Sequence, residues 1–382
     1  MDFESLFDIP IDDLHTPCYL TDARLLQKNT ALLKQIQQRT GCKILLAQKA
    51  FSMFSAYPLI RDDLAGTTAS GLFEAKLGRE HFGKEVHVFS PAYTQEDFTQ
   101  LLELCDHIVF NPFGQWKKYR QQVQDATRNI SCGIRINPGY AEVETDLYNP
   151  CISGSRMGVP LEQMEDDFAG LDGIHFHTMC EQNSDVLERT LDHMLPQFDK
   201  WLKRCKWVNF GGGHHITRPD YDVERLVRCI ERVRDTYGVQ VYLEPGEAVA
   251  LNAGYLVATV LDVVHNGMDI AILDASAACH MPDVLEMPYR PHILYSGTAG
   301  EKTHTYRLAG NTCLAGDVIG DYSFDHQLQA GEKLVFCDMA IYSMVKNNTF
   351  NGVPLPDIAL YQNGHIDLVK RFGYADFEGR LS

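Results

Sequence analysis

The order of apolar runs predicts an α/β fold, a (β/α)8 barrel of the TIM type followed by a mainly antiparallel β domain. From residue 43 to about 247, eight short strand-like runs recur with helix-like stretches between most of them. After about residue 250, further strand-like runs follow without obvious long helices between them. An open, doubly wound sheet is the alternative for the first part.

The strands expected in the first part are short. Residues 44–47 are all apolar, which is typical of a parallel strand covered on both faces. The full set of expected strands is 43–47, 65–69, 86–90, 107–110, 132–136, 173–177, 207–210 and 239–245. Before the last of these, an apolar stripe predicts an amphipathic helix, with Asp220 as a possible cap and Gly238 as a possible end. The stripe consists of Val223, Leu226, Val227, Ile230 and Val233.

The second part is expected to be a β domain. Its predicted strands are 255–266, 269–276, 303–310, 332–339 and 366–372. We assign residues 25–250 to the barrel, and residues 251–382, together with residues 1–24, to a β domain that contributes to the active site.

Composition excludes several classes of partner. The chain of 382 residues has a net charge of −17, which argues against a nucleic-acid backbone as ligand. No window approaches the roughly 18 to 20 apolar residues of a membrane span, and the first residues are acidic, unlike a secretory signal. The eleven cysteines are scattered without CxxC spacing, so neither a zinc ribbon nor a disulfide framework is indicated. We expect a cytoplasmic protein.

Polar residues and glycines collect where the predicted strands end. In a parallel barrel the carboxyl ends of all strands meet at one mouth, where active sites form. The residues concerned are Lys49, Arg135, His175, His177, the segment 211–215 ("GGGHH") and the segment 244–247 ("EPGE"). The sequence therefore predicts a ligand site at this mouth.

Each of these features has a structural alternative. Gly211, Gly212 and Gly213 suit either a phosphate or a tight turn, and no nucleotide motif accompanies them. The histidines are more often structural than metal ligands, so no metal is expected, although His177 could lie flat against an aromatic ligand. Lys49 alone would be read as a solvated lysine, but with the glycines and Glu244 it suggests a lysine that binds pyridoxal phosphate.

Several motifs resemble a known family across essentially the whole chain. The segments "LLAQKAFS", "SRMGV", "GIHFHTMCEQ", "VNFGGGHHIT", "YLEPGEAV", "GNTCLAGDVIG" and "TFNG" follow the order found in pyridoxal-phosphate decarboxylases with an alanine-racemase-like barrel. This family includes ornithine and diaminopimelate decarboxylases. Departures such as "HTMCEQ" and "CHMPDVLEMPYRP" resemble the branch that acts on carboxynorspermidine or carboxyspermidine.

The resemblance implies roles for individual residues. Lys49 would hold the cofactor, His177 would stack on its ring, and Glu244 would keep the ring nitrogen protonated. The backbone of Gly211, Gly212 and Gly213 would bind the phosphate together with Tyr342. Cys313 would protonate the substrate carbon from the neighbouring protomer, which implies a homodimer with shared sites.

Two departures from the family bear on the substrate. Ornithine decarboxylase has a phosphate-binding arginine where this chain has Glu247, so Glu247 either turns toward a cationic substrate or is neutralised nearby. Relatives carry an acidic residue after the cysteine, where this chain has Leu314. Asp274, Asp283 and Asp317 are then the candidates for binding the distal amines. Alternatives are a diaminopimelate, ornithine or lysine decarboxylase, or a non-catalytic regulatory protein of this fold.

Overall fold

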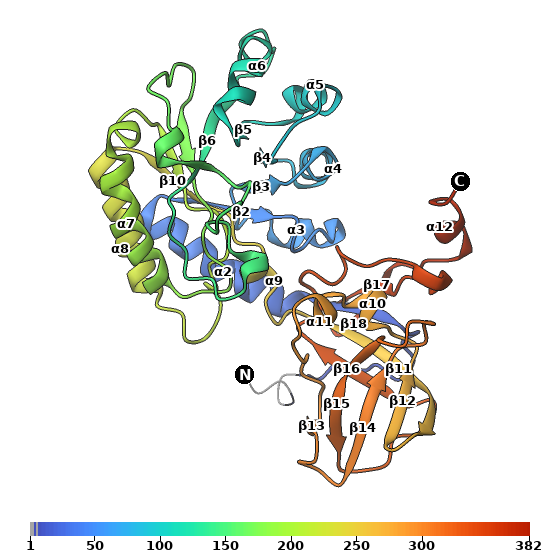
Figure 1. The fold of residues 1–382 in the computed structure, drawn as a ribbon. Helices are drawn as coiled ribbons and strands as arrows, with labels where there is room; N and C mark the ends of the chain where they lie inside the picture. Colours follow the sequence, from blue (N-terminus) through green and yellow to red (C-terminus); the bar gives the residue numbers. More distant parts are fainter. Residues whose placement is uncertain (1–3, 5–6) are drawn as a thin grey trace. The chain divides into compact units, whose positions relative to one another are not determined.

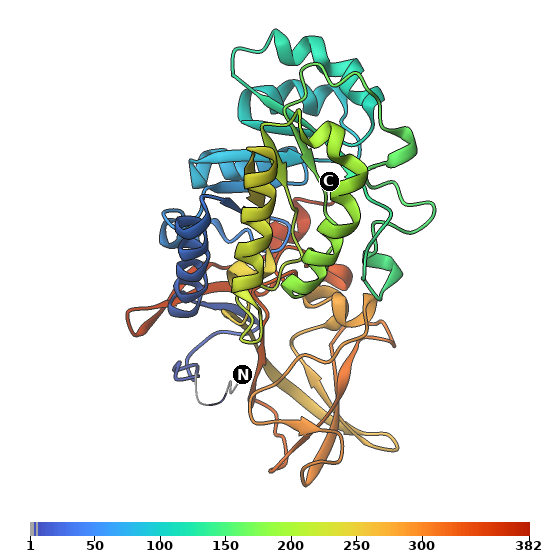
Figure 2. The same cartoon turned by 90° about the vertical axis from the view of Figure 1, so that its left-hand side faces the viewer.

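The computed structural model describes residue 4 and residues 7–382, so residues 1–3 and 5–6 of the segment assigned to the β domain lie outside the described residues. Contacts within the chain divide it into two compact units. One unit spans residues 27–249, and the other combines residues up to 26 with residues 250–382. Figures 1 and 2 show both units, which we describe separately.

The unit of residues 27–249 is a closed barrel of eight parallel strands. The ring closes because β10 pairs with β2 and β5 pairs with β6, while a ninth strand, β7 (Val159–Pro160), pairs with β6 alone. This closure confirms the predicted barrel and excludes the open sheet. Its strands are β2 (Lys43–Ala47), β3 (Gly66–Ala69), β4 (Glu85–Phe89), β5 (His107–Phe110), β6 (Ser131–Asn137), β8 (Gly173–His175), β9 (Trp207–Asn209) and β10 (Gln240–Leu243).

Helices follow most strands of the barrel, and α7 and α8 lie side by side in Figures 1 and 2. After β6 the chain instead runs through an irregular stretch with two short 3-10 turns, η3 (Asp146–Tyr148) and η4 (Leu161–Gln163). The helices are α2 (Ala23–Thr40), α3 (Tyr57–Ile60), α4 (Leu72–Leu77), α5 (Gln95–Leu104), α6 (Phe113–Gln124), α7 (Ser184–Leu202), α8 (Val223–Tyr237) and α9 (Glu247–Ala250). Among the described residues, no helix combines the length and apolar character needed to cross a membrane.

Helix α8 shows how the sequence sets its boundaries. Four of the five residues of the predicted apolar stripe are buried, and Val223 is half-buried. The predicted cap Asp220 is wrong. Asp222 caps the helix by accepting the Arg225 N–H at 2.9 Å, because it is the residue adjacent to the first turn. Gly238 ends the helix as expected, with a left-handed φ of 67°.

The other unit is built on a nine-stranded sheet with mostly antiparallel pairs, as predicted. The expected strands correspond to β11 (Gly254–His265), β12 (Asp269–Leu273), β14 (His304–Ala309), β16 (Lys333–Cys337) and β18 (His365–Lys370). The prediction missed β1 (Cys18–Asp22), β13 (Gly297–Thr298), β15 (Val318–Phe324) and β17 (Asp357–Gln362). Three short helices complete it, α10 (Ala277–His280), α11 (Asp283–Glu286) and α12 (Tyr374–Glu378).

Candidate active site at the carboxyl ends of the barrel strands

Four adjacent strands deliver the predicted site residues to one sector of the barrel mouth. Lys49 follows β2, Glu244 follows β10, the glycines follow β9 and His177 follows β8. The ring order is β2, β10, β9, β8, so these strands are direct neighbours. The structure therefore brings these residues together within the barrel.

Glu244 is buried and ionised. The Asn209 Nδ2 amide donates to Glu244 Oε1 at 2.7 Å, and Glu244 Oε2 lies 3.4 Å from His175 Nε2. Burial acts to raise the pKa of Glu244, but the contact with His175, together with His87 and the Asn209 amide, lowers the pKa below its usual value. Burial also lowers the pKa of His175, so we assign the charge of this pair to Glu244 and treat the imidazole as neutral.

The His177 ring is held in one tautomer. Its Nδ1 accepts the Gly212 N–H at 3.0 Å, which leaves Nε2 to carry the proton. Burial, with Lys49 and Arg135 nearby, lowers the pKa of His177 well below its usual value. Arg135 also donates through Nη2 to the His177 carbonyl at 3.2 Å. A neutral, fixed imidazole is suited to packing against a planar ligand.

The glycine loop requires glycine at Gly211 and Gly213, because both residues have a left-handed backbone conformation. Gly211 and Gly213 have φ of +69° and +82°, and a Cβ at Gly213 would lie 2.0 Å from the Met179 carbonyl oxygen. Gly211 donates its N–H to Asn209 Oδ1 at 2.8 Å, and the Gly212 N–H is bonded to His177. Among the described residues, the Gly213 N–H has no hydrogen-bond acceptor. Of the three predicted phosphate donors, Gly213 is thus the one whose backbone N–H is left for a ligand.

Lys49 reaches solvent at the mouth while protein atoms surround much of its length. Loss of hydration lowers the pKa of the Lys49 amine, and Arg135 lowers it further, whereas Glu244 acts in the opposite direction. A lowered pKa increases the fraction of neutral amine, which is the nucleophilic form.

Glu247 is neutralised within the barrel. Its Oε1 lies 2.9 Å from His215 Nε2, and Glu181 lies close enough that the three side chains form one cluster. Burial alone would lower the pKa of His215, but its contact with Glu247 raises the pKa. Of the two alternatives considered for Glu247, the structure shows the nearby partner.

The remaining predicted residues lie in the other unit. Cys313 is exposed and donates its backbone N–H to Asn351 Oδ1 at 2.8 Å, while Tyr342 has a positive φ of 54°. The three aspartates are each bonded within this unit. Asp274 accepts from Thr16 Oγ1 at 2.6 Å, Asp317 accepts from Ser276 Oγ at 2.8 Å and from Thr312 Oγ1 at 2.7 Å, and Asp283 pairs with Lys346. These bonds favour structural roles, and the predicted contacts with amines stay predictions.

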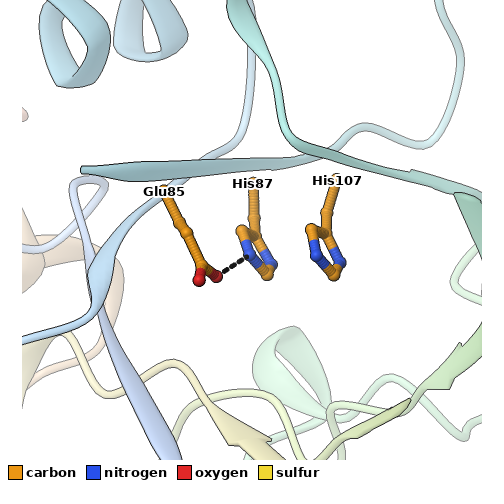
Figure 3. Close-up of side chains that lie close together, drawn as sticks. All are labelled: Glu85, His87 and His107. Carbon is orange, nitrogen blue, oxygen red and sulfur yellow. Dashed lines mark hydrogen bonds and ion pairs between the residues drawn. The ribbon is translucent and has the colours of Figure 1, made fainter. Parts of the chain in front are cut away.

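A further histidine–carboxylate cluster lies toward the amino-terminal ends of the strands (Figure 3). It consists of Glu85, His87 and His107. The two imidazole rings are stacked with centroids 3.9 Å apart and planes 7° apart. Lys43 forms an ion pair with Glu85. Parallel rings do not direct their lone pairs at one ion, and the ammonium already neutralises the carboxylate, so this geometry favours a structural cluster over a metal site.

Sequence reasoning missed Asn209, which contacts both Glu244 and the glycine loop. Its only signal was a polar residue at the end of an otherwise apolar strand, two positions before the glycines.

Comparisons with known proteins identify the family of the chain. The family described as "Pyridoxal-dependent decarboxylase, C-terminal sheet domain" matches residues 18–340. A carboxynorspermidine/carboxyspermidine decarboxylase from Campylobacter jejuni is 41% identical over 382 residues, covering 97% of this chain and 99% of the relative. A carboxyaminopropylagmatine decarboxylase from Synechocystis is 41% identical over 375 residues, covering 97% and 96%.

A solved structure extends the similarity to three dimensions. Carboxynorspermidine decarboxylase from Campylobacter jejuni, crystallised with norspermidine, matches with a TM-score of 0.89 and 40% identity, covering 96% of this chain and 100% of that chain. The chain therefore belongs to the pyridoxal-dependent decarboxylases and is an amino-acid decarboxylase with pyridoxal phosphate as its cofactor.

Proposed function

We propose that this enzyme removes the α-carboxylate of carboxynorspermidine or carboxyspermidine, giving norspermidine or spermidine in polyamine biosynthesis. The observation that carries the proposal is the 41% identity, over 97% of the chain, with a decarboxylase of these substrates. The matching structure with bound norspermidine supports a polyamine product.

The barrel residues fit the cofactor. The backbone N–H of Gly213 has no acceptor among the described residues and is available to a phosphate oxygen, while the glycine itself is required because a Cβ would meet the Met179 carbonyl. Glu244 offers an ionised carboxylate that favours the protonated form of a pyridine nitrogen. When bound, pyridoxal phosphate supplies a conjugated ring that accepts the electron pair left on the substrate's α-carbon as CO2 departs.

The chain's own residues hold and orient these groups. Lys49 holds the cofactor covalently through its amine, whose lowered pKa favours the nucleophilic form. His177 packs its neutral ring against the cofactor, in the tautomer fixed by Gly212. Glu244 keeps the proton on the ring nitrogen, and this protonation favours decarboxylation because it increases the electron demand of the ring.

The sheet unit completes the site in this proposal. Cys313 supplies the proton to the α-carbon, and its exposure leaves the thiol accessible for that role. Tyr342 adds a phosphate contact. We propose that Cys313 acts in the site of a second copy, so that the active enzyme is a cytoplasmic homodimer with shared sites. Sedimentation of an active monomer would contradict this assembly.

Acidic groups are proposed to bind the cationic substrate. Glu247, with Asp274, Asp283 and Asp317, offers carboxylates for the amines, and the net charge of −17 attracts a polycation. Because Glu247 is already paired with His215, a substrate amine would compete with this imidazole for the carboxylate.

Carboxyaminopropylagmatine is a second candidate substrate. The Synechocystis relative that acts on it is as similar to this chain, at 41% identity, as the Campylobacter one. The two substrates differ at the distal end, where a guanidinium replaces an amine. A guanidinium binds a carboxylate through two parallel hydrogen bonds, so the geometry of the distal acidic group separates the candidates.

CO2 release from a panel of purified substrates tests the proposal. We expect the highest kcat/KM with carboxynorspermidine or carboxyspermidine, and little release from diaminopimelate, ornithine or lysine. Preferential turnover of carboxyaminopropylagmatine would select the second candidate, and preferential turnover of diaminopimelate would overturn both. A protein that lacks the absorbance of bound pyridoxal phosphate and releases no CO2 would instead support a non-catalytic role.

A further inference from the structure

Asn209 joins two parts of the site that are far apart in sequence. It is fully buried at the end of β9, where its Oδ1 accepts the Gly211 N–H at 2.8 Å and its Nδ2 donates to Glu244 Oε1 at 2.7 Å. The Glu244 N–H donates in turn to the Gly211 carbonyl at 2.8 Å. Three hydrogen bonds thus form a closed circuit through Gly211, Asn209 and Glu244.

This circuit requires a side chain that both accepts and donates a hydrogen bond, as the Asn209 amide does. One of its neighbours is a backbone donor and the other is a carboxylate acceptor, and an amide presents an acceptor and a donor from the same planar group. These two partners also fix which amide atom is oxygen and which is nitrogen. An aspartate could still accept from Gly211, but it would set a second carboxylate beside Glu244. An alanine would serve neither neighbour.

We propose that Asn209 is a positioning residue that couples the two ends of the cofactor site. Through Nδ2 it holds the Glu244 carboxylate in place for the ring nitrogen. Through Oδ1 it holds the left-handed turn at Gly211, from which the loop reaches Gly213. This inference rests on the proposed roles of Glu244 and the glycine loop.

Asn137 provides a matched control. It lies at the end of β6, where its Oδ1 accepts the Gly139 N–H at 2.9 Å and its Nδ2 donates to the Pro150 carbonyl at 3.1 Å. Asn137→Ala therefore removes the same kind of two-bond amide bridge at another strand end, but without a carboxylate partner.

The experiment compares cofactor binding to apoprotein of the wild type, Asn209→Ala, Asn209→Asp, Glu244→Ala and Asn137→Ala. Affinity is measured by absorbance titration with pyridoxal phosphate. Protonation of the ring nitrogen is read from its NMR signal as a function of pH, using ¹⁵N-labelled cofactor. We expect Asn209→Ala to weaken binding by about tenfold or more, because the hydrogen bond to the Glu244 carboxylate is lost. The ring nitrogen should also lose its proton at lower pH, because Glu244 is no longer held in place for it.

Asn209→Asp separates the two functions and serves as the test if the alanine variant does not fold. It keeps the acceptor for Gly211, so we expect a smaller loss of affinity, together with a shifted titration of the ring nitrogen. In a double-mutant cycle, the effect of Asn209→Ala on cofactor affinity should be smaller in the Glu244→Ala background than in the wild type.

Wild-type affinity and wild-type titration in both Asn209 variants would overturn the inference, as would equal changes in Asn137→Ala. If instead Glu244→Ala left the ring nitrogen titration unchanged, the proposed role of Glu244 itself would fail. A wild-type protein that bound no cofactor would contradict the function on which both rest.

Discussion

Two clusters inside the barrel contain the same residue types, two histidines and one glutamate, yet differ in what surrounds their charges. The lower cluster is Glu85, His87 and His107, and the upper cluster is His175, His177 and Glu244. Toward the amino-terminal ends, Lys43 neutralises Glu85, and the stacked rings of His87 and His107 pack beside Tyr242. Toward the carboxyl ends, Glu244 has a neutral amide as its donor, and neither nitrogen of His175 makes a hydrogen bond, although Nε2 lies 3.4 Å from Glu244 Oε2. Each cluster leaves buried imidazole nitrogen unbonded, since His107 Nδ1 also has no hydrogen-bond partner among the described residues. The difference lies in the carboxylates, because an ammonium balances Glu85 whereas a neutral amide is the donor to Glu244.

The comparison shows why residue type alone does not mark an active site. In the lower cluster the negative charge is already balanced, so its bonds contribute to stability. In the upper cluster a buried carboxylate stays ionised, and among the described residues its one ion-pair contact is with a histidine that we assign as neutral. The cations Lys49 and Arg135 act on it without a direct contact. A buried charge without a direct charged partner is typical of functional sites.

The lysines of the two regions offer the largest expected contrast. Lys49→Ala should reduce CO2 release by more than about 10³-fold, because it removes the nucleophilic amine. The free energy of unfolding should change little, since Lys49 reaches solvent. Lys43→Met is the control and should lower Tm while keeping kcat/KM near the wild-type value. An active Lys49→Ala variant would break the assignment of the upper cluster.

The glutamates should show the same contrast with smaller effects. We expect Glu244→Gln to lower kcat/KM by about 10²-fold, because a neutral amide no longer favours the protonated ring nitrogen. Glu85→Gln should instead cost about 2 kcal/mol of unfolding free energy, because it leaves Lys43 and His87 without a charged partner. Kinetics and denaturant unfolding of both variants measure these changes. Loss of activity in Glu85→Gln with unchanged stability would reverse the comparison.

Much of the barrel could be predicted because buried parallel strands leave a simple pattern. Residues 44–47 have no polar position, and the observed β2 (Lys43–Ala47) has the bounds expected from sequence. In the sheet unit the pattern is weaker. Strand β15 contains Gly320 and Asp321, and β17 follows two prolines, so both look like turns from sequence alone. Tertiary pairing decides these segments, as where Arg307 of β14 pairs with Asp321 across the sheet.

The candidate site was predictable as far as strand ends could be identified. Lys49, His177 and Glu244 each follow an apolar run, and the parallel barrel places such positions together. Asn209 was not predictable because its role depends on Glu244, which is 35 residues away in sequence and becomes a neighbour only when β9 and β10 pair. The bond between Glu247 and His215 was likewise invisible, since it depends on the turns that follow these two strands.

The pH dependence of stability should report the ionisation of Glu85 in the lower cluster. Burial acts to raise the pKa of Glu85, but hydrogen bonds from His87 and Lys43 lower the pKa to about 2, compared with 4.5 for an ordinary glutamate. Its contribution to stability is therefore complete above about pH 4.5 and is lost as the pH falls toward about 2. The difference in unfolding free energy between wild type and Glu85→Gln should shrink over this interval. A difference that stays constant on acidification would contradict the lowered pKa of Glu85.

Zinc should have the smallest effect of all, because neither the charge nor the geometry of the lower cluster favours it. Three potential ligand atoms lie within 4.8 Å of one another, but the rings of His87 and His107 are within 7° of parallel, and Lys43 holds the carboxylate. A bound ion would require the rings to rotate out of their stack and the ammonium to be displaced. We therefore expect Zn²⁺ and EDTA each to leave Tm unchanged in wild type and in His107→Ala. A rise in Tm with Zn²⁺ in wild type that His107→Ala abolishes would show that the lower cluster is a metal site.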